Sequence, residues 1–320
     1  MRIRTAAAVV ALLLSMVEAH ADYSLTILHT NDFHSSFEGI DRWDHDCPAE
    51  ENAAGNCYGG SARLMTAINE ARKRTENSVL FDAGDQFPRP ENPYDLNVSL
   101  TANLMNRLAY DAMTLGNHEF DYGEDVVVEF IDRLNFPVLV ANIDFSGNPH
   151  LALGTRKSAI IERGGEKLGL IGVTLESSTA SAAYAEDVVT FDATGAVQAE
   201  VDNLIAEGVN KIIVISHLGY SADKRLAESI VGIDVIVGGH THSYLSNTFA
   251  NAVGPYPTMV NGVAVVQTFS FGLFLGELTA TFDDEGNLTK AVGDPILLDA
   301  SVAESEGITS LISNAEAELK

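Results

Sequence analysis

Five short blocks of this sequence carry aspartate, asparagine or histidine side chains of the kinds that bind metal ions. Most of the blocks directly follow a short apolar run, which places them where a buried strand ends. In open α/β sheets, ligands bind at the carboxyl ends of the strands, so we expect the blocks to meet at one edge. Together they predict the site of a two-metal hydrolase, which no single block would. The blocks are Asn31–His34, Gly84–Asp85, Gly116–Glu119, Ser216–His217 and Gly239–His242.

The candidate metal ligands come from these blocks. Asp32 and His34 stand two residues apart, so on an extended strand end both side chains would point the same way and bind one cation. Asp85 follows a glycine that lets the chain turn sharply, and its carboxylate could bridge two cations. Carboxylate and imidazole donors together suit Zn, Mn or Fe; we expect two divalent metal ions whose identity, Mg included, stays open. The candidate ligands are Asp32, His34, Asp85, Asn117, His217, His240 and His242.

His118 and Asp121 are the candidate catalytic pair. His118 adjoins the candidate ligand Asn117, cannot easily bind the same ion, and is free to face a phosphoryl group. Asp121 lies where its carboxylate can hydrogen-bond the His118 ring and keep it protonated. Two metal ions roughly 3.5–4 Å apart activate a water and stabilise both oxygens of an in-line displacement, which predicts phosphate ester hydrolysis. We expect Glu119 to be structural, and His29, His45 and His150 to lie in the core, in loops or at the surface.

The first 21 residues are typical of a secretory signal peptide. Arg2 and Arg4 precede an apolar run over 6–17 that is too short to span a bilayer, and Ala19-His20-Ala21 forms a small-x-small cleavage site. An uncleaved membrane anchor is the alternative, but no second apolar run of this kind follows. We therefore expect a soluble, exported protein, periplasmic or extracellular, whose mature chain begins near Asp22.

Size, charge and cysteine content narrow the class of protein. Without the signal peptide, the chain has the length at which a single hydrophobic core stops growing, so we expect one large domain over residues 22–300. A formal net charge of −26 argues against duplex nucleic acid and anionic membranes as partners. Cys47 and Cys57 lie in a polar segment, where an exported chain favours a disulfide worth about 2–3 kcal/mol.

Alternating helical and strand patterns predict a mainly parallel sheet with helices on its faces. Two apolar runs over 158–174, joined by Arg163-Gly164-Gly165-Glu166, predict a β-hairpin. The runs 263–266 and 275–282 are typical of antiparallel strands, which indicates a second sheet. The last residues, 308–319, have helical spacing with nothing after them to pack against. The other expected helices are at about 62–73, 100–108 and 124–134, and the other expected strands are at 79–81, 112–115, 138–141, 212–215 and 235–237.

Several stretches make the chain resemble the metallophosphoesterase domain of the secreted 5′-nucleotidase family, a branch of the calcineurin-like phosphoesterases. The resemblance runs from Leu25 to about Leu298. It implies a four-layer α/β/β/α sandwich and hydrolysis of phosphate monoesters, with nucleoside 5′-monophosphates the first guess. The stretches that carry it are Ile27–His34, Tyr58–Leu64, Tyr110–Gly123, Gly238–Ser243, Gly254–Pro257 and Val265–Gln267.

The resemblance also assigns the site residues. It places Asp85 on both metal ions and casts His118 and Asp121 as the catalytic pair, in agreement with the interpretation from the residues alone. One ion would be held by Asp32, His34, Asp85 and His242, and the other by Asp85, Asn117, His217 and His240.

Two departures from the family pattern limit what it implies. After Phe87 the family usually continues with a glycine-containing turn, whereas here Pro88-Arg89-Pro90-Glu91-Asn92-Pro93 intervenes, so the rim of the site is expected to differ. The family also carries a C-terminal domain whose aromatic residues clamp the base and whose arginines bind substrate. This chain stops before it, with 301–320 as the expected start of a connector helix. Because base stacking contributes roughly 1–3 kcal/mol, we expect nucleotide selection to weaken about ten-fold or more.

Two further functions stay open. A broader phosphodiesterase or pyrophosphatase acting on cyclic nucleotides or dinucleotides would use the same metal chemistry. A truncated relative that binds metal or nucleotide without useful turnover belongs to a different functional class, although the presence of both His118 and Asp121 speaks against it.

Overall fold

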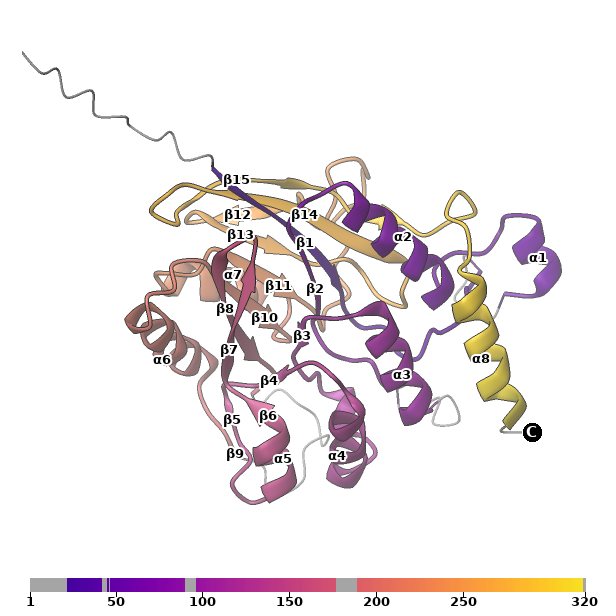
Figure 1. Cartoon of the computed structure of the whole chain (residues 1–320), viewed down its shortest axis with the longest axis horizontal. Coiled ribbons are helices and arrows are strands. Elements are labelled where there is room, and N and C mark those ends of the chain that lie inside the picture. Colours follow the sequence, from indigo (N-terminus) through magenta and orange to yellow (C-terminus); the bar gives the residue numbers. More distant parts are fainter. Residues whose placement is uncertain (1–21, 42–44, 46, 90–95, 177–188, 319–320) are drawn as a thin grey trace, which may run out of the picture.

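The computed structural model describes residues 22–41, 45, 47–89, 96–176 and 189–318 of the 320-residue chain. The predicted signal peptide and residues 90–95, which include the proline-rich segment after Arg89, lie outside these residues. Within the described part, two large sheets stack face to face and helices cover the outer face of each (Figure 1). This is the four-layer α/β/β/α arrangement predicted from the sequence.

The first sheet has the strand order β15-β14-β1-β2-β3-β4-β6, with β16 paired to β14. Its central strands, from β1 to β6 in that order, are parallel neighbours, whereas β14 pairs antiparallel with β1. The strands are β1 (Tyr23–Thr30), β2 (Ser78–Asp82), β3 (Ala112–Met113), β4 (Val138–Leu139), β6 (Thr155–Arg156), β14 (Phe274–Phe282), β15 (Leu288–Gly293) and β16 (Ile296–Leu297).

The second sheet has the order β12-β13-β11-β10-β8-β7. β7 and β8 form the predicted hairpin, and β8, β10, β11 and β13 run parallel to one another. The strands are β7 (Ser158–Arg163), β8 (Glu166–Val173), β10 (Ile212–Ser216), β11 (Val235–Gly238), β12 (Thr258–Val260) and β13 (Val263–Val266), and a small separate pair joins β5 (Ile143–Asp144) to β9 (Val189–Thr190).

The prediction of antiparallel strands near the end of the chain is partly wrong. It holds for β14, which lies antiparallel to β1 and β15 in the first sheet. β13, however, lies in the second sheet and runs parallel to β11, with only β12 antiparallel to it. All four residues of β13 are buried, so the run has no alternation from which its direction or its sheet could be inferred.

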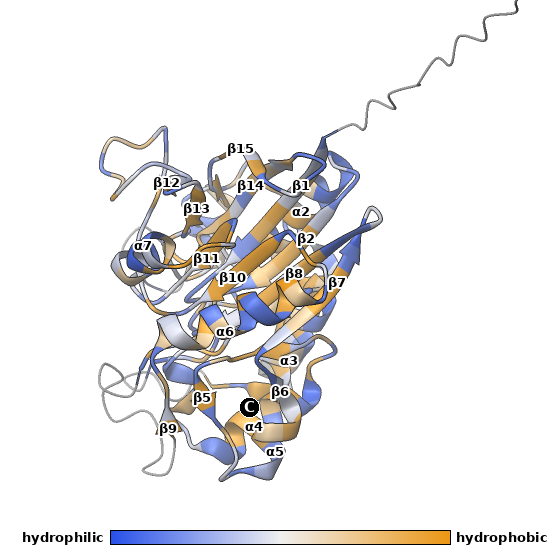
Figure 2. Ribbon diagram, turned by 90° about the vertical axis from the view of Figure 1, so that its left-hand side faces the viewer, coloured by the Kyte–Doolittle hydropathy of each residue, from blue (hydrophilic) through white to orange (hydrophobic). Residues whose placement is uncertain are grey.

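Strand β1 shows how the layers are held together. Leu25 and Ile27 face the second sheet and join a core that extends to the helices on its far side, whereas Leu28 faces the helices of the first sheet. This alternation follows the two-residue period of a strand. Figure 2 shows the apolar residues concentrated in the strands. The helices are α2 (Ser61–Lys73), α3 (Val98–Leu108) and α4 (Glu124–Arg133) on the first sheet, α6 (Ala193–Ala206) and α7 (Tyr220–Ser229) on the second, and the short α5 (Pro149–Gly154) beside α4.

The last helix, α8 (Glu306–Glu318), confirms the helical pattern predicted for the end of the sequence. Ile308 and Ile312 are buried against α2 and α3, beside which α8 lies in Figure 1. Its role as a connector to a further domain stays a prediction. Among the helices that the structure describes, none combines the length and the apolar character needed to cross a membrane.

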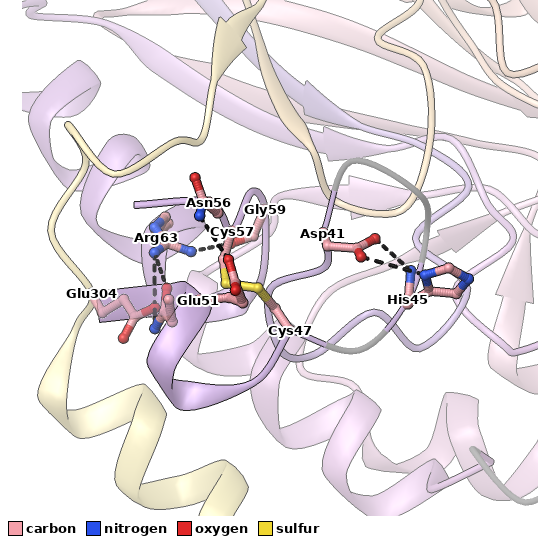
Figure 3. The surroundings of a disulfide bond; sticks show 10 residues. Asp41, His45, Cys47, Glu51, Asn56, Cys57, Gly59, Arg63 and Glu304 are labelled. Carbon is pink, nitrogen blue, oxygen red and sulfur yellow. Dashed lines mark hydrogen bonds and ion pairs between the residues drawn. A yellow bond between two sulfur atoms is a disulfide. The ribbon is translucent and has the colours of Figure 1, made fainter. Parts of the chain in front are cut away.

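The predicted disulfide joins Cys47 to Cys57 and closes the loop that carries α1 (Ala49–Ala53) (Figure 3). Beside it, the buried guanidinium of Arg63 donates to Asn52 Oδ1 at 2.6 Å and forms an ion pair with Glu304 at 3.2 Å. These contacts fix the loop to the segment that leads into α8.

Candidate active site

The five predicted blocks all follow parallel strands. Those at Asn31, Gly84 and Gly116 follow β1, β2 and β3 of the first sheet, whereas those at His217 and Gly239 follow β10 and β11 of the second. The candidate ligands group into two clusters, Asp32 with His34 and His242, and Asp85 with His217 and His240, and the donor atoms within each cluster lie within 4.8 Å of one another. The clusters are linked because the backbone N–H of His240 donates to Asp32 Oδ2 at 2.9 Å.

The backbone at these positions is left-handed rather than extended. Asp32 and His34 have φ of 50° and 48°, so the expectation that both project from an extended strand end is wrong. They converge because their N–H groups donate to the carbonyls of Gly84 and Asp85, at 2.9 and 3.0 Å, which pairs the two loops. Asp85, His240 and His242 also have positive φ. Such conformations cost of order 1–3 kcal/mol each and cluster at functional sites.

Two glycines allow the loops after β2 and β3 to approach each other. Gly84 has a φ of 89°, as its predicted sharp turn requires, and a Cβ there would lie 2.5 Å from the Gly116 nitrogen. A Cβ on Gly116 would in turn overlap the Asp85 carboxylate. The carboxylate of Asp85 can therefore lie at the junction of the two loops only if both positions lack a side chain.

The first cluster places two ring nitrogens and a carboxylate oxygen close together. His34 donates from Nδ1 to the Phe87 carbonyl at 3.1 Å, so its Nε2 carries the lone pair. That Nε2 lies 3.2 Å from Nε2 of His242, which itself lies 3.3 Å from Asp32 Oδ1. Three converging donors of this kind fit a divalent cation.

The second cluster contains a buried donor atom without a hydrogen-bond partner. His217 donates from Nδ1 to the Ala83 carbonyl at 2.6 Å, which leaves the lone pair on Nε2. This Nε2 is buried, makes no hydrogen bond, and lies 3.1 Å from Asp85 Oδ2. A ring nitrogen and a carboxylate oxygen that face each other in a buried position fit a metal ion. The Asn117 side-chain oxygen lies 3.1 Å from Nδ1 of His240, next to this cluster.

The charges in the second cluster favour a positive ion. Burial opposes the ionised form of Asp85, yet His217 and the neighbouring histidines hold the pKa of this carboxyl well below its usual range. Burial also opposes a charged His217, but Asp85 and Asp32 outweigh it and raise the pKa of His217 to about 10, so Nε2 binds a positive charge, either a proton or a metal ion in its place. For His34 and His240 burial dominates and lowers the pKa, so these rings are neutral and able to act as ligands.

His118 and Asp121 lie together beside the first cluster. Nδ1 of His118 is 2.5 Å from Asp121 Oδ2, and the ring meets that of His34 edge-on, with 5.3 Å between centroids. The His118 backbone N–H donates to Asp85 Oδ1 at 2.9 Å, which fixes the short 3₁₀ turn His118–Phe120 against the second cluster. His118 and His242 are partly exposed whereas Asp32 and His217 are fully buried, so the site opens on the side of His118.

Glu119 has the structural role expected of it. It is fully buried, and its carboxylate accepts four backbone N–H groups from the loops after β2 and β3. The donors are Gly116 at 2.6 Å, Asp85 at 3.0 Å, Gln86 at 2.6 Å and Phe87 at 3.2 Å. The histidines expected to lie outside the site also do so: His29 is buried against Tyr256, and His45 and His150 are exposed.

Two residues that shape the site were not predicted to do so. Gln267 is buried; its Nε2 donates to the Gly239 carbonyl at 2.7 Å, and its Oε1 accepts the Ser243 N–H, which holds the loop that carries His240 and His242. A buried glutamine directly after the apolar run of β13 is the signal that could have found it. Phe271 lies with its ring centroid 5.6 Å from those of both His34 and His242. No local pattern indicates this contact.

Comparison with known proteins places this geometry in a family context. A sequence profile of the calcineurin-like phosphoesterases matches residues 25–244. The human 5′-nucleotidase is 37% identical over 307 residues, which cover 91% of this chain and 52% of that protein. The snake venom 5′-nucleotidase of Crotalus adamanteus is 36% identical over 313 residues, covering 94% and 52%. The chain thus spans about half the length of the curated relatives it matches.

Comparison with solved structures agrees with the sequence comparison. A 5′-nucleotidase precursor from Thermus thermophilus superposes with a TM-score of 0.84 at 34% identity, covering 93% of this chain and 59% of that one. The NAD nucleotidase of Haemophilus influenzae superposes with a TM-score of 0.75 at 26% identity, covering 93% and 56%.

Proposed function

This chain belongs to the calcineurin-like phosphoesterase family, and we propose that it hydrolyses phosphate monoesters, nucleoside 5′-monophosphates first among them, with two divalent metal ions as cofactors. The observation that carries the proposal is the pair of linked donor clusters with the His118–Asp121 pair at their open side. The choice of nucleotides draws on relatives named 5′-nucleotidases at 36–38% identity.

In the proposed mechanism each side chain has one task. Asp32, His34 and His242 would hold one ion, His217, His240 and Asn117 would hold the other, and Asp85 would contribute to both. When bound, the ions lower the pKa of a water and stabilise the attacking and leaving oxygens. Asp121 accepts the Nδ1–H of His118, which orients the ring so that a proton held at Nε2 can be donated to a phosphoryl oxygen.

We also propose export for this protein. The proposal rests on the signal pattern in the first 21 residues and on relatives from snake venom. Sequencing the amino terminus of protein recovered outside the cytoplasm should give a chain that starts near Asp22; a start at Met1 would contradict cleavage.

A second candidate function is hydrolysis of a dinucleotide at its phosphoanhydride bond. The observation that favours it is the similarity to the NAD nucleotidase of Haemophilus influenzae. Two assays with Mn, Zn or Mg separate the two functions: phosphate release from AMP and a generic aryl phosphate, and release of AMP and nicotinamide mononucleotide from NAD.

The central test is replacement of Asp85. We expect Asp85→Asn to lose turnover of AMP by about 10³-fold or more, because the buried charge that faces His217 is removed. Bound metal, measured by plasma emission spectrometry, should fall in parallel. Asp132→Asn, on the exposed face of α4, is the matched control and should behave as wild type. Activity and metal content near wild type in Asp85→Asn would overturn the two-metal proposal.

A further inference from the structure

Arg89 lies at the rim of the candidate site, in the segment where this chain departs from the pattern of the family it resembles. Its guanidinium carbon lies 5.1 Å from the ring centroid of Phe271. The Phe271 ring in turn contacts His34 and His242 of the first cluster. Arg89 is thus a cation separated from the metal ligands by a single aromatic ring. We propose that Arg89 is a substrate-binding residue that contacts phosphate oxygens of the ester.

The backbone from Phe87 to Arg89 is fixed to the loops that carry His34 and Asp121. The Tyr122 hydroxyl donates to the carbonyls of Pro88 and Arg89, at 3.2 and 3.3 Å. Tyr122 directly follows Asp121, and the Phe87 carbonyl, two residues before Arg89, accepts from His34. The position of Arg89 is therefore set by the same loops that set the catalytic pair and the first cluster.

The position of Phe271 is also fixed by its neighbours. It has a φ of 58°, a conformation that bulky residues adopt only when their surroundings enforce it, and its N–H donates to the Asp32 carbonyl at 2.8 Å. The next residue is Gly272, where a Cβ would lie 2.5 Å from the buried Phe33 ring. The ring that supports Arg89 is thus part of the loop packing around Asp32 and His34.

The charge of Arg89 is available for a ligand. Among the described residues, no carboxylate forms an ion pair with it, and its side chain is partly exposed. A guanidinium held over an aromatic face can direct its N–H groups to phosphate oxygens at the same time. The chain has a net charge of −26, which repels a phosphate dianion. A cation at the rim of the candidate site would offset part of this repulsion.

This inference rests on the proposed function and is tested with the mature, Mn²⁺-loaded protein. Arg89→Gln should raise the KM for AMP about ten-fold while kcat changes by less than about two-fold, as expected for a lost charge-assisted contact to the ground state and transition state alike. Calorimetry with inorganic phosphate should show a similar loss of affinity. Arg89→Lys keeps the charge but not the planar guanidinium. Its KM for AMP and its affinity for phosphate should lie between those of the wild type and of Arg89→Gln.

Arg74→Gln is the matched control. Arg74 precedes β2, at the opposite end of the strand from the site, and pairs with Glu277, so its KM should equal that of wild type. Comparison of AMP with ADP identifies the contacted group: equal losses for both indicate the phosphate that AMP and ADP share, and a larger loss for ADP indicates a further contact to its second phosphate. Unchanged KM and phosphate affinity in Arg89→Gln, or a loss of bound Mn²⁺ in that variant, would overturn the proposal. Absence of hydrolysis in the wild type would instead overturn the proposed function, and phosphate calorimetry would still test Arg89.

Discussion

Asp121 can act on a substrate through His118, because its carboxylate lies 2.5 Å from Nδ1 of that ring. We therefore predict that Asp121→Asn lowers kcat for AMP about 10²-fold with a much smaller change in KM, since a neutral amide replaces the carboxylate that accepts from Nδ1 of His118 and orients its ring. Bound metal should be unchanged, because Asp121 lies in neither donor cluster. Steady-state kinetics and metal analysis check both parts.

Asp125→Asn is the control for this prediction, as Asp125 is exposed in the first turn of α4 a few residues further along the chain. If Asp121→Asn kept wild-type kcat, the pair would be a structural contact only. If it lost metal as well, Asp121 would support the ligands rather than His118.

At the level of single residues, the sequence was informative about side-chain chemistry and uninformative about backbone conformation. The donor types at Asp32, Asp85 and His217 could be predicted because each follows an apolar run. Their conformations could not, since positive φ is normally indicated by glycine or asparagine, and here aspartate and histidine adopt it. The strain is maintained by hydrogen bonds from loops that are distant in sequence, such as the one from Asp32 to Gly84.

The loops after β2 and β3 behave as one element because Glu119 joins them. We predict that Glu119→Gln destabilises the protein by about 2–3 kcal/mol and weakens metal binding, since the amide has one acceptor oxygen where the carboxylate has two for four N–H donors. Chemical denaturation and metal titration measure the two effects. The exposed replacement Glu129→Gln, in α4, is the control. Wild-type stability in Glu119→Gln would show that the loops hold each other without it.

The carboxyl group of Asp234, next to the start of β10, has a raised pKa. Asp234 accepts the N–H of Ile212 at 2.8 Å, and burial raises the pKa of Asp234 to about 7 from its ordinary value of 3.8. A carboxyl whose pKa is raised on folding binds its proton more tightly in the folded state. Its contribution to stability is therefore complete below about pH 4 and is lost as the pH rises through about 7.

Replacement by asparagine should remove this dependence, because the amide oxygen still accepts from Ile212 but does not titrate. We predict that the loss of unfolding free energy between about pH 5 and about pH 8 is smaller in Asp234→Asn by on the order of 1 kcal/mol. Urea denaturation at both pH values measures it. Asp234 lies at the start of β11, whereas the site lies beyond its end, so activity should be preserved. Identical pH dependence in the two proteins would mean that Asp234 keeps an ordinary pKa.

Across the whole molecule, the order of the elements could be predicted and their assignment to sheets could not. The periodicities of β2, α3, α4 and β10 are local properties, and these elements form close to where they were expected. The division of β13 and β14 between sheets depends on long-range pairing that the buried run of β13 does not encode. For the same reason the contact of Phe271 with His34, from opposite ends of the chain, appears only in the fold.

The two donor clusters take residues from both sheets, so metal binding should stabilise the stacking of the sheets as well as the site. Asp32 and Asp85 follow strands of the first sheet, and His217, His240 and His242 follow strands of the second.

Ions that bind the folded chain stabilise it by linkage, about 2.7 kcal/mol when present at a hundred times Kd. We therefore predict that chelation lowers the midpoint of thermal unfolding by about 5 °C or more. In Asp85→Asn the starting midpoint should be lower and the further effect of the chelator small, because the buried donor pair with His217 is already broken. Calorimetric scans with and without chelator measure both. A wild-type midpoint that chelation leaves unchanged, in protein shown to contain metal beforehand, would mean that the sheets are held by their shared core alone and that the ions serve only the chemistry.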